Sequence, residues 1–167
     1  DILVNNAGIW PTENALEMPD ENWSRVMDIN LNGPYMLCKR VMNQMVDKKI
    51  QGSIINITSK SAFQYNTAGH AHYATAKAGI NMLVRTLARE SAEFGIRVNG
   101  IAPGMVRTPI NEDKWGDPEL QEYYNKRIPV GRFALPIEIG YSVAFLASEK
   151  SFNINGTILD VTGGMLI

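Results

Sequence analysis

Four short runs of mostly β-branched, apolar residues are spaced along this chain and alternate with segments of helical periodicity. Each run is too short for a helix and too continuously apolar for a half-exposed strand, a pattern typical of parallel strands buried on both faces. We expect these strands at residues 2–5, 53–58, 96–102 and 157–161. Their alternation with helices predicts an α/β fold, a doubly wound parallel sheet with right-handed crossovers, in a single domain covering residues 1–167.

The charge balance argues against a polyanionic partner. The formal net charge is −1, from 16 basic and 17 acidic residues, so neither nucleic acid nor an anionic membrane surface is expected as a partner. No apolar run approaches the roughly 20 residues that cross a bilayer. The single cysteine, Cys38, has no partner for an internal disulfide, and a buried free thiol is typical of a reducing compartment. We therefore expect a cytoplasmic protein.

In a doubly wound sheet, ligands bind outside the carboxyl ends of the strands. The residues that follow the four predicted strands are therefore candidates for a site. They are Asn5-Asn6-Ala7-Gly8, Thr58-Ser59, Pro103-Gly104 and Thr162-Gly163-Gly164. The first group offers small, backbone-exposing residues where a flat ligand could approach, and Pro103-Gly104 repeats that feature.

Tyr73 and Lys77 lie four residues apart at the start of a predicted helix, so their side chains share one face. A phenol has an ordinary pKa of about 10, and a nearby positive charge favours the phenolate. We expect Lys77 to lower the pKa of Tyr73, which could then exchange a proton with an alcohol or carbonyl oxygen. Taken alone, the pair is also compatible with an ordinary surface pair on a helix.

Two further polar residues are candidates on local grounds. Ser59 directly follows the second predicted strand, where its hydroxyl could stabilise a developing charge on a substrate oxygen; an ordinary turn serine is the alternative, and Ser61 is a competitor. Asn30 lies four residues before Pro34, which has no N–H to bond the Asn30 carbonyl. We expect a helix kink there, with a free carbonyl suited to holding a water; taken alone, the residue is better explained by an ordinary proline kink without such a role.

Taken in order, these segments resemble the short-chain dehydrogenase/reductase family, in its Asn-Asn-Ala-Gly and Tyr-x-x-x-Lys branch. The resemblance covers nearly the whole chain, from Asp1-Ile2-Leu3-Val4-Asn5-Asn6-Ala7-Gly8 through Asn30, Ser59, Tyr73–Lys77, Arg97–Gly104 and Ile128–Phe133 to Gly163-Gly164. It implies a Rossmann-like sheet and an NAD(P)-dependent oxidoreductase that interconverts a secondary alcohol and a ketone. The cofactor would be NAD or NADP, and no metal is implied.

The resemblance also implies a role for each matching residue. Tyr73 would be the catalytic acid/base, Lys77 would lower its pKa and bind the nicotinamide ribose, and Ser59 would orient the substrate oxygen. The Asn30 carbonyl would hold a water that links Lys77 to solvent. The cofactor cleft would be lined, besides Tyr73 and Lys77, by Asn6, Ala7, Gly8, Gly104, Val106 and Thr108.

Two departures from the family pattern qualify this interpretation. The spacing from Ser59 to Tyr73 is slightly longer than usual, so Ser61 remains an alternative. The family's opening strand, glycine-rich phosphate loop and following strand–helix units have no counterpart here, and no initiator methionine is present. We therefore expect an N-terminally truncated chain, inactive alone, whose pyrophosphate site and NAD-or-NADP selector lie outside it. The alternative is a non-catalytic binding or assembly protein of the same fold.

The remaining expectations concern the surroundings of the site. The resemblance implies that residues 105–130 form a lid over the substrate, in which Trp115 is either a substrate contact or a packing hydrophobe. Trp10 and His72 are placed near the substrate mouth, and the loop histidines lack metal-ligand spacing. The resemblance implies a small alcohol or carbonyl substrate and a homodimer or homotetramer.

Overall fold

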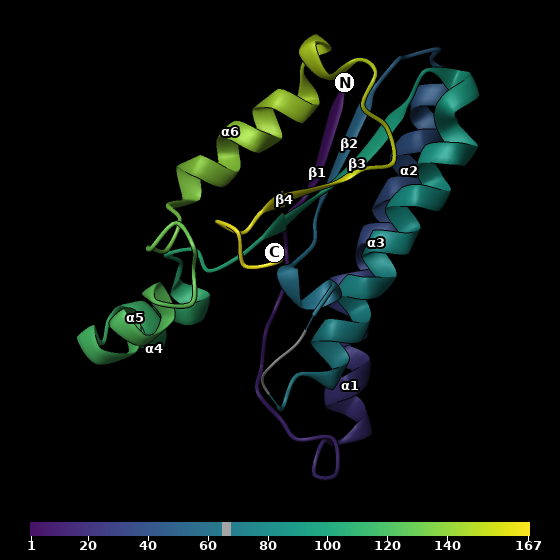
Figure 1. The fold of residues 1–167 in the computed structure, drawn as a ribbon. Helices are drawn as coiled ribbons and strands as arrows, with labels where there is room; N and C mark the ends of the chain where they lie inside the picture. Colours follow the sequence, from purple (N-terminus) through teal and green to yellow (C-terminus); the bar gives the residue numbers. More distant parts are fainter. Residues whose placement is uncertain (65–67) are drawn as a thin grey trace.

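The computed structural model describes residues 1–64 and 68–167 and contains a four-stranded parallel sheet (Figure 1). The strands are β1 (Ile2–Asn5), β2 (Ser53–Ile57), β3 (Arg97–Pro103) and β4 (Ile158–Val161), in the spatial order β1-β2-β3-β4. All three pairings are parallel, and Asn5 lies opposite Asn56, which lies opposite Gly100. The sequence-based prediction of a parallel α/β sheet is therefore confirmed, and no strand bound differs from its predicted position by more than one residue.

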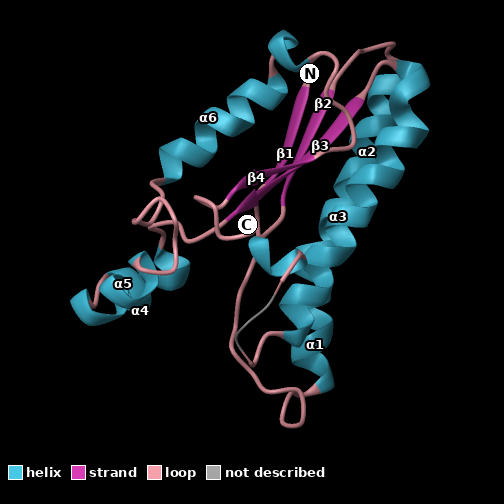
Figure 2. Ribbon diagram, viewed as in Figure 1, coloured by secondary structure: helices cyan, strands magenta, loops and turns pink. Residues whose placement is uncertain are grey.

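Helices cover both faces of the sheet, as a doubly wound fold requires (Figures 1 and 2). On one face lie α2 (Gly33–Asp47) and α3 (Ala71–Ser91), and on the other lies α6 (Pro136–Ala147). The remaining helices are α1 (Asp20–Met27), α4 (Glu112–Trp115) and α5 (Pro118–Asn125), with a π-helical turn at Asp28–Asn32 and 3-10 turns at Lys60–Ala62, Ala92–Phe94, Pro109–Asn111 and Glu149–Ser151. None of the helices in the described ranges has the length and apolarity needed to cross a membrane.

Two apolar cores result from the alternation of side chains along β2. Successive residues of a strand point to opposite faces, so Ile54 packs with Cys38 and Val84 under α2 and α3, whereas Ile55 packs with Leu146 under α6. The second core is smaller, because α6 covers the sheet alone on its side.

Burial on both faces, which the sequence predicts for all four strands, holds only for the central pair. β2 and β3 are almost completely buried, but Ile2 and Val4 of β1 are 59% and 40% exposed. The reason is that α6 packs against β2 and β3 and leaves one face of β1 uncovered. A continuous apolar run shows that both faces of a strand could be buried, but whether they are depends on the elements that pack against the strand.

The kink expected at Pro34 is present and takes the form of a π-helical turn. Residues Asp28–Asn32 form this turn between α1 and α2, and Pro34 occupies the first turn of α2. A proline ring clashes with the carbonyl four residues earlier, and the wider π-helical turn accommodates it. The turn leaves the Asn30 side chain fully buried and directed at the loop after β1.

Candidate active site

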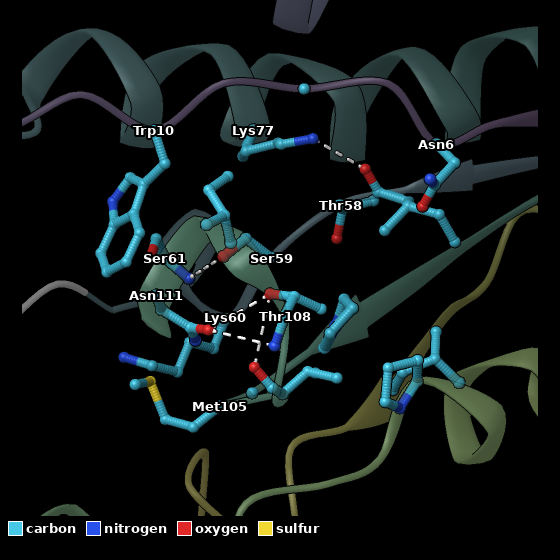
Figure 3. Close-up of a pocket in the computed structure, with 18 of the residues that line it drawn as sticks. Asn6, Trp10, Thr58, Ser59, Lys60, Ser61, Lys77, Met105, Thr108 and Asn111 are labelled. Atoms are coloured by element: carbon cyan, nitrogen blue, oxygen red, sulfur yellow. Dashed lines mark hydrogen bonds between the residues drawn. The ribbon is translucent and has the colours of Figure 1, made fainter. Parts of the chain in front are cut away.

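A cavity of about 850 Å³ lies at the carboxyl ends of the strands, where the fold predicts a ligand site. In Figure 3, Trp10, Lys77 and Asn6 lie in the upper part of the view, and Met105 and Thr108 lie below them. The cavity wall includes eight of the residues expected from the sequence, namely Asn6, Gly8, Ser59, Tyr73, Lys77, Gly104, Val106 and Thr108. Of the other two, Ala7 is exposed beside the cavity wall and Asn30 is buried behind it.

Ser59 and Tyr73 contact each other in the cavity wall. Ser59 ends the extended segment after β2, and its hydroxyl oxygen accepts a hydrogen bond of 3.1 Å from the backbone N–H of Ser61. The phenol of Tyr73, in the first turn of α3, forms a side-chain hydrogen bond with Ser59. Ser61 therefore orients Ser59 through its backbone, and Ser59 is the serine that meets the phenol.

Lys77 lies one helical turn beyond Tyr73 and is only 5% exposed. Its Nζ donates a hydrogen bond of 2.9 Å to the Ile57 carbonyl oxygen and lies 5.7 Å from the centre of the Tyr73 ring. Burial lowers the pKa of Lys77 to about 8, because desolvation disfavours the charged form. One hydrogen bond to a carbonyl oxygen therefore does not offset the cost of burying the charged form of Lys77.

The expected lowering of the Tyr73 pKa by Lys77 is not found. Burial raises the pKa of Tyr73, and the contribution that lowers it comes from the hydrogen bond with Ser59. Burial removes water from both groups and favours the neutral form of each, so it raises the pKa of the phenol and lowers the pKa of the amine. The i, i+4 spacing correctly places the two side chains together, but it cannot show how deeply they are buried.

Asn30 acts in this structure through its side chain. Its Nδ2 donates to the carbonyl oxygens of Ile9 and Val26, at 3.0 and 3.1 Å, and its Oδ1 accepts from the Ile9 N–H at 3.3 Å. These bonds fix the loop after β1 against the π-helical turn. A Cβ atom added to Gly8 would lie 2.8 Å from Asn30 Oδ1 and 3.6 Å from Lys77 Nζ, so Gly8 leaves Lys77 close to the cavity.

Trp10 borders the cavity as expected, but its histidine neighbour is His70 and not His72. His70 stacks on Trp10 with ring centroids 4.9 Å apart, and its Nδ1 lies 2.9 Å from the Pro11 carbonyl oxygen. His72 is fully buried, and its Nδ1 accepts from the Tyr73 N–H at 2.9 Å. The helix start at Ala71 decides which histidine faces inward, and the sequence alone did not fix that start. Within the described ranges, no group of three or more potential metal ligands comes together.

Other parts of the cavity wall were not anticipated from the sequence. One face of α6 contributes small and apolar residues, Pro136, Ile139, Gly140, Val143 and Ala144. Lys60 and Lys114 also line the cavity. Trp115 packs against the cluster of Met105, Ile128 and Phe133 and donates a hydrogen bond of 3.0 Å to the Thr108 carbonyl oxygen. It is therefore a packing hydrophobe of this segment in the structure.

Known proteins resemble this chain over its whole length. The family model described as enoyl-(acyl carrier protein) reductase matches residues 1–166. The chain is 42% identical to 3beta-hydroxysteroid dehydrogenase 1 of Eggerthella lenta over 100% of its own length and 64% of that protein. It is 38% identical to a 3-oxoacyl-(acyl-carrier-protein) reductase of Thermotoga maritima over 100% of its own length and 66% of that protein.

Solved structures of dehydrogenases also resemble this chain over nearly its whole length. A 4-hydroxyisoleucine dehydrogenase complexed with NADH superposes with a TM-score of 0.96 at 30% identity, over 99% of this chain and 68% of that one. A gluconate 5-dehydrogenase from Burkholderia cenocepacia, in complex with NADP and tartrate, gives a TM-score of 0.93 at 34% identity, over 99% and 64%. The chain thus spans about two thirds of the length of these relatives. The match over residues 1–166, together with the Ser59, Tyr73 and Lys77 geometry, shows that the chain belongs to the short-chain dehydrogenase/reductase family.

Proposed function

We propose that the full-length protein containing this chain is an NAD(P)-dependent oxidoreductase that interconverts a secondary alcohol and a ketone. The observation that carries this proposal is the hydrogen bond between Ser59 and Tyr73 beside buried Lys77, inside a cavity at the strand ends. A hydroxyl, a phenol and an amine at one point form a proton-transfer site for an alcohol oxygen. The relatives described above are named dehydrogenases or reductases, and two solved neighbours hold NADH or NADP.

The cavity wall suits the nicotinamide end of such a cofactor. Gly8 and Asn6 both line the cavity, and a Cβ at Gly8 would clash with Asn30 Oδ1 at 2.8 Å and lie 3.6 Å from Lys77 Nζ. The Thr58 hydroxyl is buried in the wall without a hydrogen-bond partner among the described residues, so it can serve a ligand. We assign Asn6, Ala7 and Gly8 to one side of the cofactor, Tyr73 and Lys77 to its ribose, and Gly104, Val106 and Thr108 to the nicotinamide end. When bound, the nicotinamide ring supplies or accepts the hydride.

The protein's own residues would handle the proton. In the proposed mechanism, Ser59 donates a hydrogen bond to the substrate oxygen. During oxidation, Tyr73 first passes its own proton to the neutral amine of Lys77 and, as the phenolate, then takes the proton of the substrate hydroxyl. During reduction, the neutral phenol gives its proton to the carbonyl oxygen and recovers one from Lys77. Lys77, with its pKa lowered to about 8 by burial, can exchange that proton near neutral pH. We further propose that the Asn30 carbonyl holds a water that continues this relay to solvent, as the family resemblance implies.

The segment 105–130 is proposed as a lid, because it supplies one wall of the cavity and carries the short helices α4 and α5. A homodimer or homotetramer is proposed from exposed apolar side chains on α2 and α3. These are Tyr35, Met36, Leu37 and Met82. Such residues on neighbouring helices form a surface that association would cover.

The test is turnover by the full-length protein, followed through the absorbance of NADH or NADPH with a panel of ketones and secondary alcohols. Tyr73→Phe should lower kcat by about 10²- to 10⁴-fold, the usual contribution of a general acid/base. Tyr141→Phe, on the exposed side of α6 and outside the cavity wall, is the matched control and should keep full activity. A well-folded protein that neither binds nor turns over either cofactor would refute the proposal. The binding or assembly alternative would then lead, because β1 exposes Ile2 and Val4 at an edge of the sheet.

A further inference from the structure

The charges in the cavity wall are all of one sign. Among the described residues that line the cavity, three are lysines, Lys60, Lys77 and Lys114, and none is an aspartate or glutamate. Lys77 is occupied by the Ile57 carbonyl oxygen and the proposed proton relay. Lys60 and Lys114 have no part in that chemistry, yet both side chains line the same cavity.

Lys60 directly follows Ser59, in the 3-10 turn Lys60–Ala62 (Figure 3). Its side chain is partly buried, and within residues 1–64 and 68–167 its ammonium makes no ion pair. Burial and the positive charge of Arg127 both lower the pKa of Lys60. A partly desolvated cation with another cation near it is unfavourable unless a negative group joins it. Lys60 therefore brings an uncompensated charge to the cavity wall, one residue after the serine that meets the Tyr73 phenol.

Lys114 approaches the same centre from the lid segment. Its Nζ lies 4.7 Å from the centre of the Trp10 ring, and that ring lies 6.2 Å from the ring of Tyr73. Lys114 also pairs with the Asp113 carboxylate at 2.8 Å. Asp113 is 68% exposed and does not line the cavity, and exposed ion pairs contribute little. The pairing therefore leaves Lys114 able to bind a second negative group inside the cavity.

We propose, on the basis of the function proposed above, that the substrate is an anionic alcohol or ketone whose carboxylate or phosphate binds Lys60 and Lys114. Ser59 and Tyr73 hold the reacting oxygen, Lys60 lies on the serine side, and Lys114 lies over Trp10 on the tyrosine side. A hydroxy acid of a few carbons, or the matching oxo acid, has both the oxygen that Ser59 and Tyr73 would hold and the carboxylate that the two lysines would bind. Trp10 supplies an apolar face for the carbon chain between them.

The experiment compares matched substrates with the full-length protein. The pairs are gluconate and glucitol, 3-hydroxybutyrate and 2-butanol, and glycerol 3-phosphate and glycerol, so that carboxylate and phosphate are tested separately. We expect kcat/KM to favour the anionic member of at least one pair about tenfold or more, as a charged hydrogen bond allows. Lys60→Met should reduce this preference by about tenfold, mainly through KM, and Lys60→Arg should retain it. Lys48→Met, at the exposed end of α2, is the matched control and should leave the preference unchanged.

A binding measurement keeps the inference independent of turnover. Succinate titrated into the wild-type protein should change tryptophan fluorescence, with the change lost in Trp10→Phe and weakened in Lys60→Met. Equal use of charged and neutral substrates, or equal losses on both in Lys60→Met, would overturn the anion site and leave the oxidoreductase proposal standing. A raised cofactor KM in Lys60→Met, with an unchanged substrate preference, would assign the lysine to a cofactor phosphate instead. Absence of all turnover with succinate still bound would refute the oxidoreductase proposal and retain the anion site.

Discussion

Replacement of Gly8 by alanine tests how the loop after β1 is held. The positive-φ glycines of the described chain do not include Gly8, so alanine meets a steric obstacle and no backbone strain. The added Cβ would lie 2.8 Å from Asn30 Oδ1, well inside normal contact. Asn30 is fully buried and cannot turn away without breaking its bonds to the N–H and carbonyl of Ile9.

The magnitude follows from those bonds. Each typical hydrogen bond contributes about 1 kcal/mol, and a buried group left without a partner costs more. We therefore expect Gly8→Ala to lower the free energy of unfolding by about 2–3 kcal/mol. Gly140→Ala is the matched control: its Cβ would have nothing nearer than 3.9 Å within α6. Alanine is the better helix former, so this control should be stabilised by about 0.5–1 kcal/mol.

Urea unfolding followed by circular dichroism measures these differences, and a double-mutant cycle tests their cause. Asn30→Ala removes the obstructing oxygen, so Gly8→Ala should cost much less in that background than in the wild type. The two changes should therefore be non-additive by at least about 1 kcal/mol. Additive effects, or a Gly8→Ala protein as stable as the wild type, would show that Asn30 does not fix this loop.

Three further outcomes are expected. Lys77→Met should raise the free energy of unfolding at pH 7 by about 2 kcal/mol. The fall in the Lys77 pKa from 10.5 to about 8 means that burying its charged form costs roughly 3 kcal/mol, and methionine avoids this cost but loses the hydrogen bond to the Ile57 carbonyl oxygen. The gain should shrink as pH rises from 8 towards 10.5, where the folded wild type has already lost the proton that the unfolded chain still holds; a constant gain in pH-dependent urea unfolding would contradict it. Hydrogen bonds from Arg132 and the Leu135 N–H lower the pKa of Glu138 to about 2, so its stabilisation is full above pH 4.5 and disappears towards pH 2. Glu138→Gln should remove that part of the acid-unfolding profile, and an unchanged profile would argue against the pair. Cys38 is fully buried and its pKa is raised by burial, so Ellman's reagent should react with it only after unfolding.

Much of the fold could be predicted because its signals are local. Ile54 and Ile55 are adjacent apolar residues in a run too short for a helix, and they pack on opposite faces of β2. The exposure of Ile2 and Val4 has no such signal, since it depends on how far α6 extends across the sheet. The π-helical turn is an intermediate case: Pro34 predicts a disturbance, but not which geometry absorbs it.

The candidate site also has features that could be predicted from the sequence and features that could not. Tyr73, Lys77 and Ser59 could be named because their spacing and their position after a strand follow from the chain alone. The rise in the Tyr73 pKa could not, because it depends on the depth of packing around both side chains. The wall formed by α6 gave no signal, since apolar residues that face a ligand and those that face a core have the same helical spacing.

Lys77 is difficult to explain by stability alone. An apolar side chain at this 5%-exposed position would avoid the cost of burying an amine, yet the chain places a lysine there with a single carbonyl partner. A buried ionisable residue that opposes local stability and lines a cavity indicates a site whose chemistry requires it. Because Lys77 lines the cavity at the carboxyl ends of the parallel strands, beside Ser59 and Tyr73, the energetic cost of burying it supports the proposal that this cavity is a proton-transfer site.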